Sequence, residues 1–290
     1  AGLDSRMADA ALSAGAEFSY GTRYISHSTS GRVSIVTSTG DVESSSIVGA
    51  DGHSSKVARS VPGSGPEEYL RGIQADVAVR MEHQDMFRVR LGSRYAPGFF
   101  TWEIPCGDFT RIGLCTSWSA GPPAPYLKRL LSDIGVEERI VGMHSGKIPL
   151  GNGGNTVADR TALVGDAACQ VKPVSGGGLY PGLTAAGILA ETLLTSVRDG
   201  DFTKDALEKY ENDCDKAFGS ELRAGRRLRR MFTRMSDEDL NAAGRYASRD
   251  DVRSILDGID IDHPSRVVRG LVRHPAAMLS AIPLIMRCIV

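Results

Sequence analysis

Long apolar runs are missing from this 290-residue sequence, and so is an excess of charge of either sign. No segment reaches the ~20 apolar residues that a membrane-spanning helix needs. The nearest approach, 276–290, is shorter and is interrupted by Pro283 and Arg287. We interpret it as a helix packed on the protein's own core, with a surface that contacts a bilayer as the alternative. The formal net charge of −1 argues against nucleic acid as a main partner.

Cysteine is sparse, and its spacing excludes the usual structural uses of thiols. The five cysteines are odd in number and include no Cys-x-x-Cys pair. Since the sequence also shows no metal-binding spacing and no secretory signal, we expect reduced thiols, no bound metal and a cytoplasmic location. The hydrophobic fraction of 41% is ordinary for a globular protein, and the length suggests one or two domains.

Strand-like patterns dominate the first half of the chain and helical patterns the second. Apolar spacing predicts a helix from Leu3 to Ala14, capped by Gly15. Strands spaced about ten residues apart, with few helices between them, indicate an antiparallel sheet. From Asp201 onward the pattern is helical and charged. The strands are predicted at 18–26, 32–38, 46–51, 70–80, 86–91, 99–104, 109–116 and 140–149, and one helix among them at 125–134.

The first motif with chemical meaning is Gly-Ala-Asp-Gly-His-Ser-Ser at 49–55. A buried strand delivers Asp51 to a tight turn in which Gly52 can adopt positive φ. A helix is expected to start behind the turn, with Ser54 or Ser55 as its N-cap. Backbone N–H groups at such a turn can hold a pyrophosphate, or hold the loop that does so. The alternative is an ordinary strand–turn–helix unit of an α/β sheet.

The second motif is the most informative part of the chain. An apolar run over 162–164 predicts a short buried strand that ends at Gly165 and Asp166. Three glycines, Gly176 to Gly178, precede a helical pattern from Leu179 to Thr195. A carboxylate here can accept hydrogen bonds from ribityl hydroxyls, while glycine N–H groups and the positive helix end suit the flavin edge where negative charge develops. A glycine-rich loop without a ligand is the alternative.

These motifs resemble those of the geranylgeranyl reductase family of FAD-dependent enzymes, within the flavoprotein class that includes aromatic hydroxylases. The first motif looks like the Asp-Gly element of that class, and Gly165-Asp166, Pro173 and the run Gly-Gly-Gly-Leu-Tyr-Pro-Gly at 176–182 look like the reductase form of its Gly-Asp element. The segment Phe-Phe-Thr-Trp-Glu-Ile-Pro-Cys-Gly at 99–107 is similar to the reductases' Tyr-x-Trp-x-Phe-Pro-x-Gly.

That segment departs from the family pattern. The tyrosine of the pattern does not occur in it and Ile104 stands in place of the phenylalanine, which leaves the lining of the pocket open. Further along the chain, the segments 235–240 and 272–275 look like the C-terminal region of archaeal members. The resemblance therefore covers nearly the whole chain.

The resemblance implies FAD as the cofactor and gives roles to individual residues. Asp51 and Gly52 would support the pyrophosphate side, and Tyr24 would contact the adenine through its backbone. No catalytic residue is assigned, and the proton donor stays unidentified. Residues expected at the ribityl chain and the flavin ring are Gly165, Asp166, Pro173, Gly176, Gly177, Gly178 and Leu179, and those expected to line an apolar tunnel for an isoprenoid chain are Trp102, Pro105 and Tyr180. A tryptophan on a strand or a tyrosine beside the glycines can also simply pack.

One part of the family pattern is missing. The Gly-x-Gly-x-x-Gly fingerprint of the N-terminal βαβ unit does not occur, and we expect it to precede Ala1, so that at least ~30 residues are lacking. The expected organisation is mixed α/β. It comprises part of a Rossmann-like FAD-binding domain (1–66), an antiparallel-sheet substrate domain of the aromatic-hydroxylase type (67–157), a return segment of the FAD-binding domain (158–198) and a C-terminal helical region (199–290).

The basic run at 223–230 is usually interpreted as a solvated helix face. Arg223, Arg226, Arg227 and Arg230 share one face at helical spacing. The alternative is a face that meets anionic phospholipid headgroups, with the protein peripheral on the cytoplasmic side of a membrane.

The expected activity is FAD-dependent reduction of C=C bonds in geranylgeranyl chains on archaeal glycerophospholipid precursors, once the missing N-terminal segment is supplied. Expected partners are a geranylgeranylated lipid and an electron donor, either ferredoxin-like or a nicotinamide. Two alternatives remain open. One is a flavin-dependent monooxygenase of the aromatic-hydroxylase class, which would share both aspartate motifs. The other is a non-catalytic fragment that binds lipid or membrane.

Overall fold

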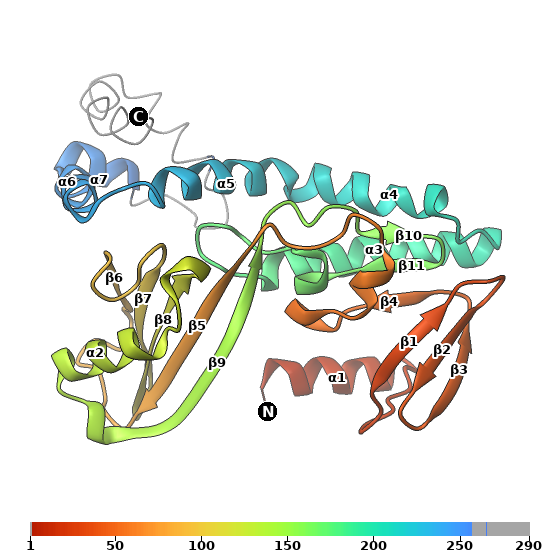
Figure 1. Ribbon diagram of the computed structural model, residues 1–290, viewed down its shortest axis with the longest axis horizontal. Coiled ribbons are helices and arrows are strands. Elements are labelled where there is room, and N and C mark those ends of the chain that lie inside the picture. Colours follow the sequence, from red (N-terminus) through yellow and green to blue (C-terminus); the bar gives the residue numbers. More distant parts are fainter. Residues whose placement is uncertain (1, 257–264, 266–290) are drawn as a thin grey trace. The chain divides into compact units, whose positions relative to one another are not determined.

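The computed structural model describes residues 2–256 and 265, and Figure 1 shows the arrangement of its helices and strands. The chain forms two units, 1–47 and 48–290. The segments 272–275 and 276–290, for which the sequence suggested a family likeness and a helix, lie outside the described residues.

The first unit contains one helix and a three-stranded antiparallel sheet. The helix α1 (Leu3–Ser13) begins and ends close to its predicted bounds. It is followed by β1 (Tyr24–Ser28), β2 (Val33–Thr37) and β3 (Gly40–Ser44), in the order β1-β2-β3. The third strand was not predicted, because its sequence Gly-Asp-Val-Glu-Ser contains a single residue that favours strands.

The second unit is built around a five-stranded antiparallel sheet in the order β6-β7-β8-β5-β9, which confirms the predicted sheet. The helix α2 (Ala124–Ile134) packs Leu127, Leu130 and Leu131 against Ala75, Val77, Ile112 and Leu114, on one face of this sheet. Side chains alternate between the faces of a strand, so the residues between these point to the other face. The strands are β5 (Glu68–Val77), β6 (Arg88–Leu91), β7 (Phe100–Cys106), β8 (Phe109–Ser117) and β9 (Ile140–Leu150).

A second, smaller sheet joins the two motif-bearing strands. Its order is β10 (Val157–Ala158), β11 (Thr161–Leu163) and β4 (Ile47–Gly49). The N–H of Val164 donates to the carbonyl of Gly49 over 3.0 Å. A Cβ at Gly49 would lie only 2.8 Å from a Leu163 methyl carbon, so this close approach needs glycine.

Helices make up most of the remainder. The helices α4 and α5 are joined by a π-helical turn (Asp215–Gly219) into one continuous rod (Figure 1). Within residues 2–256, no helix is both long enough and apolar enough to span a bilayer. The helices are α3 (Leu179–Asp199), α4 (Lys204–Cys214), α5 (Ser220–Phe232), α6 (Asp237–Ala247) and α7 (Asp250–Leu256).

A buried hydroxyl ties α4 to the loop that follows β11. Tyr210 is fully buried, and its hydroxyl donates to the carbonyl of Leu163 (2.8 Å) and accepts from the Gln170 amide nitrogen (2.6 Å). The Gln170 carbonyl oxygen in turn accepts from the N–H of Gly165 (2.7 Å). Because each of these buried polar groups has a partner, the hydrogen bonds offset the cost of desolvation and the network holds the loop in place.

The basic helix α5 is partly turned toward the protein body. Arg229 is buried, pairs with Glu68 (2.6 Å) and donates to the carbonyl of Gly98 (3.1 Å). Arg226 is half-buried, and burial lowers the pKa of its guanidinium. Of the four arginines predicted to share a face, Arg226 is thus partly buried, while Arg223, Arg227 and Arg230 are exposed and Arg223 forms an ion pair with Asp215.

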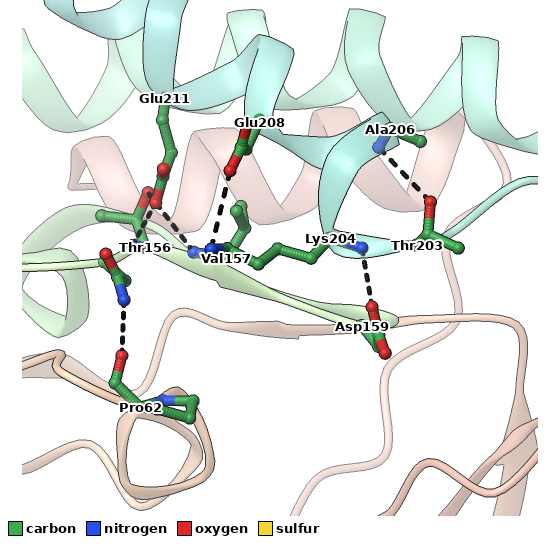
Figure 2. Close-up of polar contacts among 10 residues, drawn as sticks. Pro62, Thr156, Val157, Asp159, Thr203, Lys204, Ala206, Glu208 and Glu211 are labelled. Atoms are coloured by element: carbon green, nitrogen blue, oxygen red, sulfur yellow. Dashed lines mark hydrogen bonds and ion pairs between the residues drawn. The ribbon is translucent and has the colours of Figure 1, made fainter.

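A carboxylate on α4 holds the edge of the small sheet (Figure 2). One oxygen of Glu211 accepts from the hydroxyl of Thr156 (3.0 Å), from its N–H, and from the N–H of Val157 (3.1 Å). One turn earlier, Glu208 forms a 3.6 Å pair with Lys204, and both side chains are largely exposed. Glu211 therefore accepts hydrogen bonds from two backbone N–H groups, whereas Glu208 pairs with a side chain.

We predict that Glu211→Ala lowers the free energy of unfolding by about 1–3 kcal/mol, because it leaves backbone donors of Thr156 and Val157 without their acceptor. Glu208→Ala is the matched control on the same helix and should cost less than about 0.5 kcal/mol, as exposed pairs do. Urea titration monitored by circular dichroism measures both values. Equal losses in the two variants would contradict the assigned role of Glu211.

We also predict that Tyr210→Phe costs about 1–3 kcal/mol, since it removes a hydroxyl that satisfies two buried groups. Tyr126→Phe removes a hydroxyl that donates to the carbonyl of Ala120 over a long 3.4 Å, and should cost less than half as much. The same unfolding measurement applies. A Tyr210→Phe protein as stable as the parent would show that the network does not hold the loop.

Candidate functional site

The two motifs meet at one cavity of about 290 Å³. Their strands, β4 and β11, are neighbours in the small sheet, so the loops that leave the strand ends lie side by side. The cavity is lined by residues from both loops and from the start of β5: Gly52, His53, Ser54, Ser55, Ala58, Arg59, Ser64, Gly65, Pro66, Tyr69, Asp166 and Ala167.

Asp51 organises the first loop. Its carboxylate accepts from the Ser55 hydroxyl (2.6 Å) and from the N–H of Lys56 (2.7 Å), and Gly52 has the expected positive φ of 77°. The predicted helix start is instead a pair of short 3₁₀ turns, Gly52–Ser54 and Val57–Ser60, because the carboxylate takes the backbone donors that would begin an α-helix. Asp51 thus shapes the loop that lines the cavity.

Asp166 faces the cavity from the second loop. One carboxylate oxygen lies so close to Gly178 that a Cβ there would be 3.1 Å away. Burial raises the pKa of the Asp166 carboxyl, and the nearby His53 partly offsets this effect. A carboxylate that is desolvated without a full set of donors is suited to accept hydrogen bonds from a ligand.

The glycine run forms a tight loop at the start of α3. Gly176 N–H donates to the Lys172 carbonyl (2.8 Å) and Lys172 N–H donates to the Gly177 carbonyl (3.0 Å). Gly176 has φ of 72°, and a Cβ on it would lie 3.0 Å from Ile148 and 3.3 Å from Phe99. Gly178 is the N-cap of the 21-residue helix α3. The helix therefore directs its positive end at the loop, next to Asp166.

The strand β7 carries two of the residues predicted for the substrate. The indole of Trp102 lies against Gly113, where a Cβ would come within 2.5 Å of the ring. Phe100 meets Trp102 edge-on, with ring centroids 6.3 Å apart. Trp102 and Pro105 are three residues apart on a regular strand, so they point to opposite faces of the sheet. The structure brings Trp102, but not Pro105, to the face opposite α2.

That face has a bare floor next to the glycine loop. Gly146, Gly72 and Cys115 are directly opposed across β9, β5 and β8, so only one of the three carries a side chain. A Cβ at Gly146 would meet no atom within 4 Å. Two residues further along β9, Ile148 reaches Gly176, which connects the floor to the loop. The floor is thus open and adjacent to the loop that precedes α3, while Gln74, His144 and the Arg111–Asp76 pair lie further along the same face.

The remaining predicted residues lie in three different settings. Leu179 and Tyr180 are in the first turn of α3 and are 67% and 42% exposed. Pro173 lies against Gly225 of α5, where a Cβ would be 3.1 Å away. Tyr24 belongs to the first unit, where its hydroxyl bonds the His27 ring nitrogen (2.6 Å).

Cysteine contributes no ionised thiol to the site, although Cys115 is part of the floor. Burial raises the pKa of the Cys115, Cys169 and Cys214 thiols to about 12, so these thiols are protonated at neutral pH. All four cysteines within the described part of the chain are unpaired. No group of three or more metal-ligating side chains occurs among residues 2–256.

Several positioning residues were missed by sequence reasoning. Phe99 and Ile148 pack against Gly176, and Gln170 with Tyr210 holds the loop after β11. Phe99 stood within a recognised segment, and its stacking on Phe100 with ring centroids 4.2 Å apart is a tertiary contact. Tyr210 bonds to Gln170, which lies 40 residues earlier, and no local sequence pattern around either residue indicates this contact.

Comparison with known proteins gives consistent relatives. The chain is 33% identical over 213 residues to a digeranylgeranylglycerophospholipid reductase of Methanothrix thermoacetophila, which covers 69% of the chain and 54% of the relative. It is 30% identical over 245 residues to digeranylgeranylglycerophospholipid reductase 2 of Methanothermobacter thermautotrophicus, covering 80% and 63%. The chain thus spans little more than half the length of the curated relatives it matches. No family model matches.

Solved structures agree on the fold. A geranylgeranyl bacteriochlorophyll reductase-like protein from Thermoplasma acidophilum superposes with a TM-score of 0.83 at 18% identity, covering 97% of this chain and 74% of that one. A flavin-dependent halogenase superposes with a TM-score of 0.67 at 16% identity, covering 96% and 59%. The mixed α/β fold with its antiparallel sheet is shared with these proteins. With the archaeal relatives and both motifs at one cavity, the chain belongs to the geranylgeranyl reductase family.

Proposed function

We propose that the complete protein is an FAD-dependent reductase that saturates C=C bonds of geranylgeranyl chains on archaeal glycerophospholipid precursors. One observation carries the proposal: the Asp166 carboxylate, the glycine loop and the start of α3 converge beside the open, glycine-rich floor of the large sheet. The names of the archaeal relatives supply the substrate class. Since the chain spans only part of those relatives, the activity is proposed for the whole protein.

The residues present fit a flavin. The buried Asp166 carboxylate can accept hydrogen bonds from ribityl hydroxyls, and Gly178 keeps the space beside it clear of a side chain. Gly165, Gly176, Gly177 and Leu179 bring backbone close to the same place. Gly52 belongs to the loop that Asp51 organises at the other end of the cavity, which suits the pyrophosphate. Tyr24 would contact the adenine through its backbone.

The sheet face fits an isoprenoid chain. Its floor at Gly146, Gly72 and Cys115 leaves room for a flat apolar chain, and Trp102 with Phe100 forms an aromatic wall on one side. Tyr180 would contact the chain from the α3 side. Such a surface binds by burial of apolar area and excludes water from the reacting bond. Pro105, on the other face, would contribute to the strand rather than to this wall.

Reduced FAD would supply the hydride for one alkene carbon, and a proton must reach the other. The chain's own residues bind and orient the lipid beside the glycine loop, and the dry floor raises the strength of every polar contact there. An electron donor, ferredoxin-like or nicotinamide, would reduce the flavin. Peripheral contact with anionic lipid is proposed for the exposed residues of α5, Arg227 and Arg230.

The activity is tested without oxygen. The complete protein with reduced FAD is mixed anaerobically with a geranylgeranylated glycerophospholipid, and flavin absorbance near its oxidised maximum is followed. Reoxidation together with a product heavier by two hydrogens per bond supports the reductase. Reoxidation that requires oxygen would instead indicate a monooxygenase, and a protein that never retains flavin would indicate a lipid-binding role alone.

We predict that Asp166→Asn weakens FAD binding about tenfold or more, because charge-assisted bonds to the ribityl chain are lost. In the flavin-free protein the same change should stabilise the fold at neutral pH. Burial raises the folded-state pKa of Asp166 above its ordinary value, so the parent loses stability as pH rises through that pKa, while the asparagine variant does not.

Two measurements check this prediction. Flavin fluorescence titration gives the affinity, and unfolding at pH 3 and pH 7 gives the stability difference, which should vanish at the lower pH. Asp85→Ala, an exposed carboxylate in the loop between β5 and β6, is the control and should change neither. An asparagine variant that binds FAD as the parent does would overturn the role of Asp166.

We predict that Gly146→Leu raises KM for the lipid about tenfold or more, because its side chain would fill the floor that the isoprenoid chain occupies. The fold should accept the change, since nothing lies within 4 Å of the added Cβ. Ser145→Leu places the same side chain on the opposite face of β9 and is the matched control. Steady-state kinetics and FAD affinity are measured on both variants. Equal KM values would exclude this face as the lipid site.

A further inference from the structure

A cationic cluster lies on the other face of the large sheet, toward the end of β5 that meets the cavity. Arg71 on β5 is directly opposed to Lys147 on β9. The Arg71 guanidinium carbon lies 3.7 Å from the centroid of the Trp118 ring, and the Lys147 ammonium lies 5.2 Å from the same ring. We call these three residues the Arg71–Lys147–Trp118 cluster.

The cluster carries two positive charges that no carboxylate compensates. In the part of the chain that the structure describes, neither Arg71 nor Lys147 forms an ion pair. Like charges directly opposed on neighbouring strands are unfavourable. Other arginines of this sheet are neutralised in place, as Arg111 is by Asp76 (2.8 Å). The sheet therefore holds Arg71 and Lys147 opposite each other although their charges repel.

Unsatisfied polar atoms lie in the same register row. The Nε of Arg71 and the Oγ1 of Thr116 are both buried without a hydrogen-bond partner. Thr116 is the residue directly opposed to Arg71 on β8 and is 0% exposed. Buried polar groups are normally paired, so orphans beside two uncompensated cations indicate that a polar ligand completes the row.

The cluster is continuous with the cavity of the two motifs. Tyr69, two residues before Arg71 on the same face of β5, lines that cavity and donates its hydroxyl proton to the carbonyl of His53 (3.0 Å). Its ring lies 5.9 Å from the Lys147 ammonium and 6.2 Å from the Trp118 ring. Trp118 itself is 45% exposed, so the cluster is open to a ligand from solvent.

We propose that the Arg71–Lys147–Trp118 cluster binds the phosphate group of a small molecule that works at the adjoining site. Arg71 offers a planar set of donors that Trp118 keeps in one orientation, and Lys147 adds a second charge. A bound phosphate would remove the repulsion across the row. The phosphate would belong either to a nicotinamide dinucleotide or to the headgroup of the lipid. These two candidates follow from the proposed function, whereas the binding of a phosphate does not depend on it.

The test is direct binding of inorganic pyrophosphate to the complete protein, measured by isothermal titration calorimetry. Arg71→Gln and Lys147→Gln should each weaken binding about tenfold or more, and added salt should weaken the parent's binding. Lys128→Gln, an exposed cation on α2, is the control and should bind as the parent does. No measurable binding, or equal binding by the Arg71 and Lys128 variants, overturns the site.

A stability measurement separates a ligand site from a purely structural cluster. Lys147→Glu places opposite charges on the row, so it should abolish pyrophosphate binding while leaving the melting temperature of the ligand-free protein unchanged or higher. A melting temperature that falls together with the loss of binding would assign the cluster to folding alone. This readout requires no flavin and no turnover, so it stays valid if the proposed reductase activity fails.

Kinetics then identify the source. In the holoenzyme, Arg71→Gln should raise KM for only one of two substrates, a nicotinamide dinucleotide or a phosphorylated geranylgeranyl lipid. An effect on the dinucleotide assigns the cluster to the reductant. An effect on the lipid that disappears with geranylgeraniol, which lacks the phosphate, assigns it to the headgroup. Unchanged KM for both substrates would overturn either assignment.

Discussion

The pairing of β4 with β11 is the constraint on which the site depends. A backbone hydrogen bond from Val164 to Gly49, and a contact so close that Gly49 has no room for a side chain, hold two strands that are more than 100 residues apart in sequence. Each strand ends in an Asp-containing loop. Without this pairing, the Asp51 loop and Asp166 would not line the same cavity.

Three further contacts hold the glycine loop in place from different sides. Tyr210 on α4 fixes the segment between β11 and the loop through Gln170. Gly225 on α5 packs against Pro173, and the buried Arg229 ties the same helix to Glu68 and to the carbonyl of Gly98. The C-terminal helices therefore act as a brace. Their charged sequence suggested a solvated surface, whereas Gly225 and Arg229 contact the interior of the protein.

The two faces of the large sheet carry different groups. One face presents a floor nearly bare of side chains, an aromatic wall and the Arg111–Asp76 pair, while the other holds α2 at one end and a pair of uncompensated cations at the other. Both faces come from the same strands, because successive residues of a strand point to opposite sides. In the proposals made above, an apolar chain and a phosphate would therefore occupy different faces of the sheet.

The sequence by itself determined most element types, the antiparallel sheet, both aspartate motifs and the glycine loop, because each depends on local periodicity or on backbone freedom at particular residues such as Gly52 and Gly176. Only the tertiary structure decided which side chains face each other. It turned the expected helix after Asp51 into 3₁₀ turns, placed Trp102 and Pro105 on opposite faces, buried Arg229 and opposed Arg71 to Lys147. Register and long-range packing arise from contacts between distant segments, and a local pattern carries no record of them.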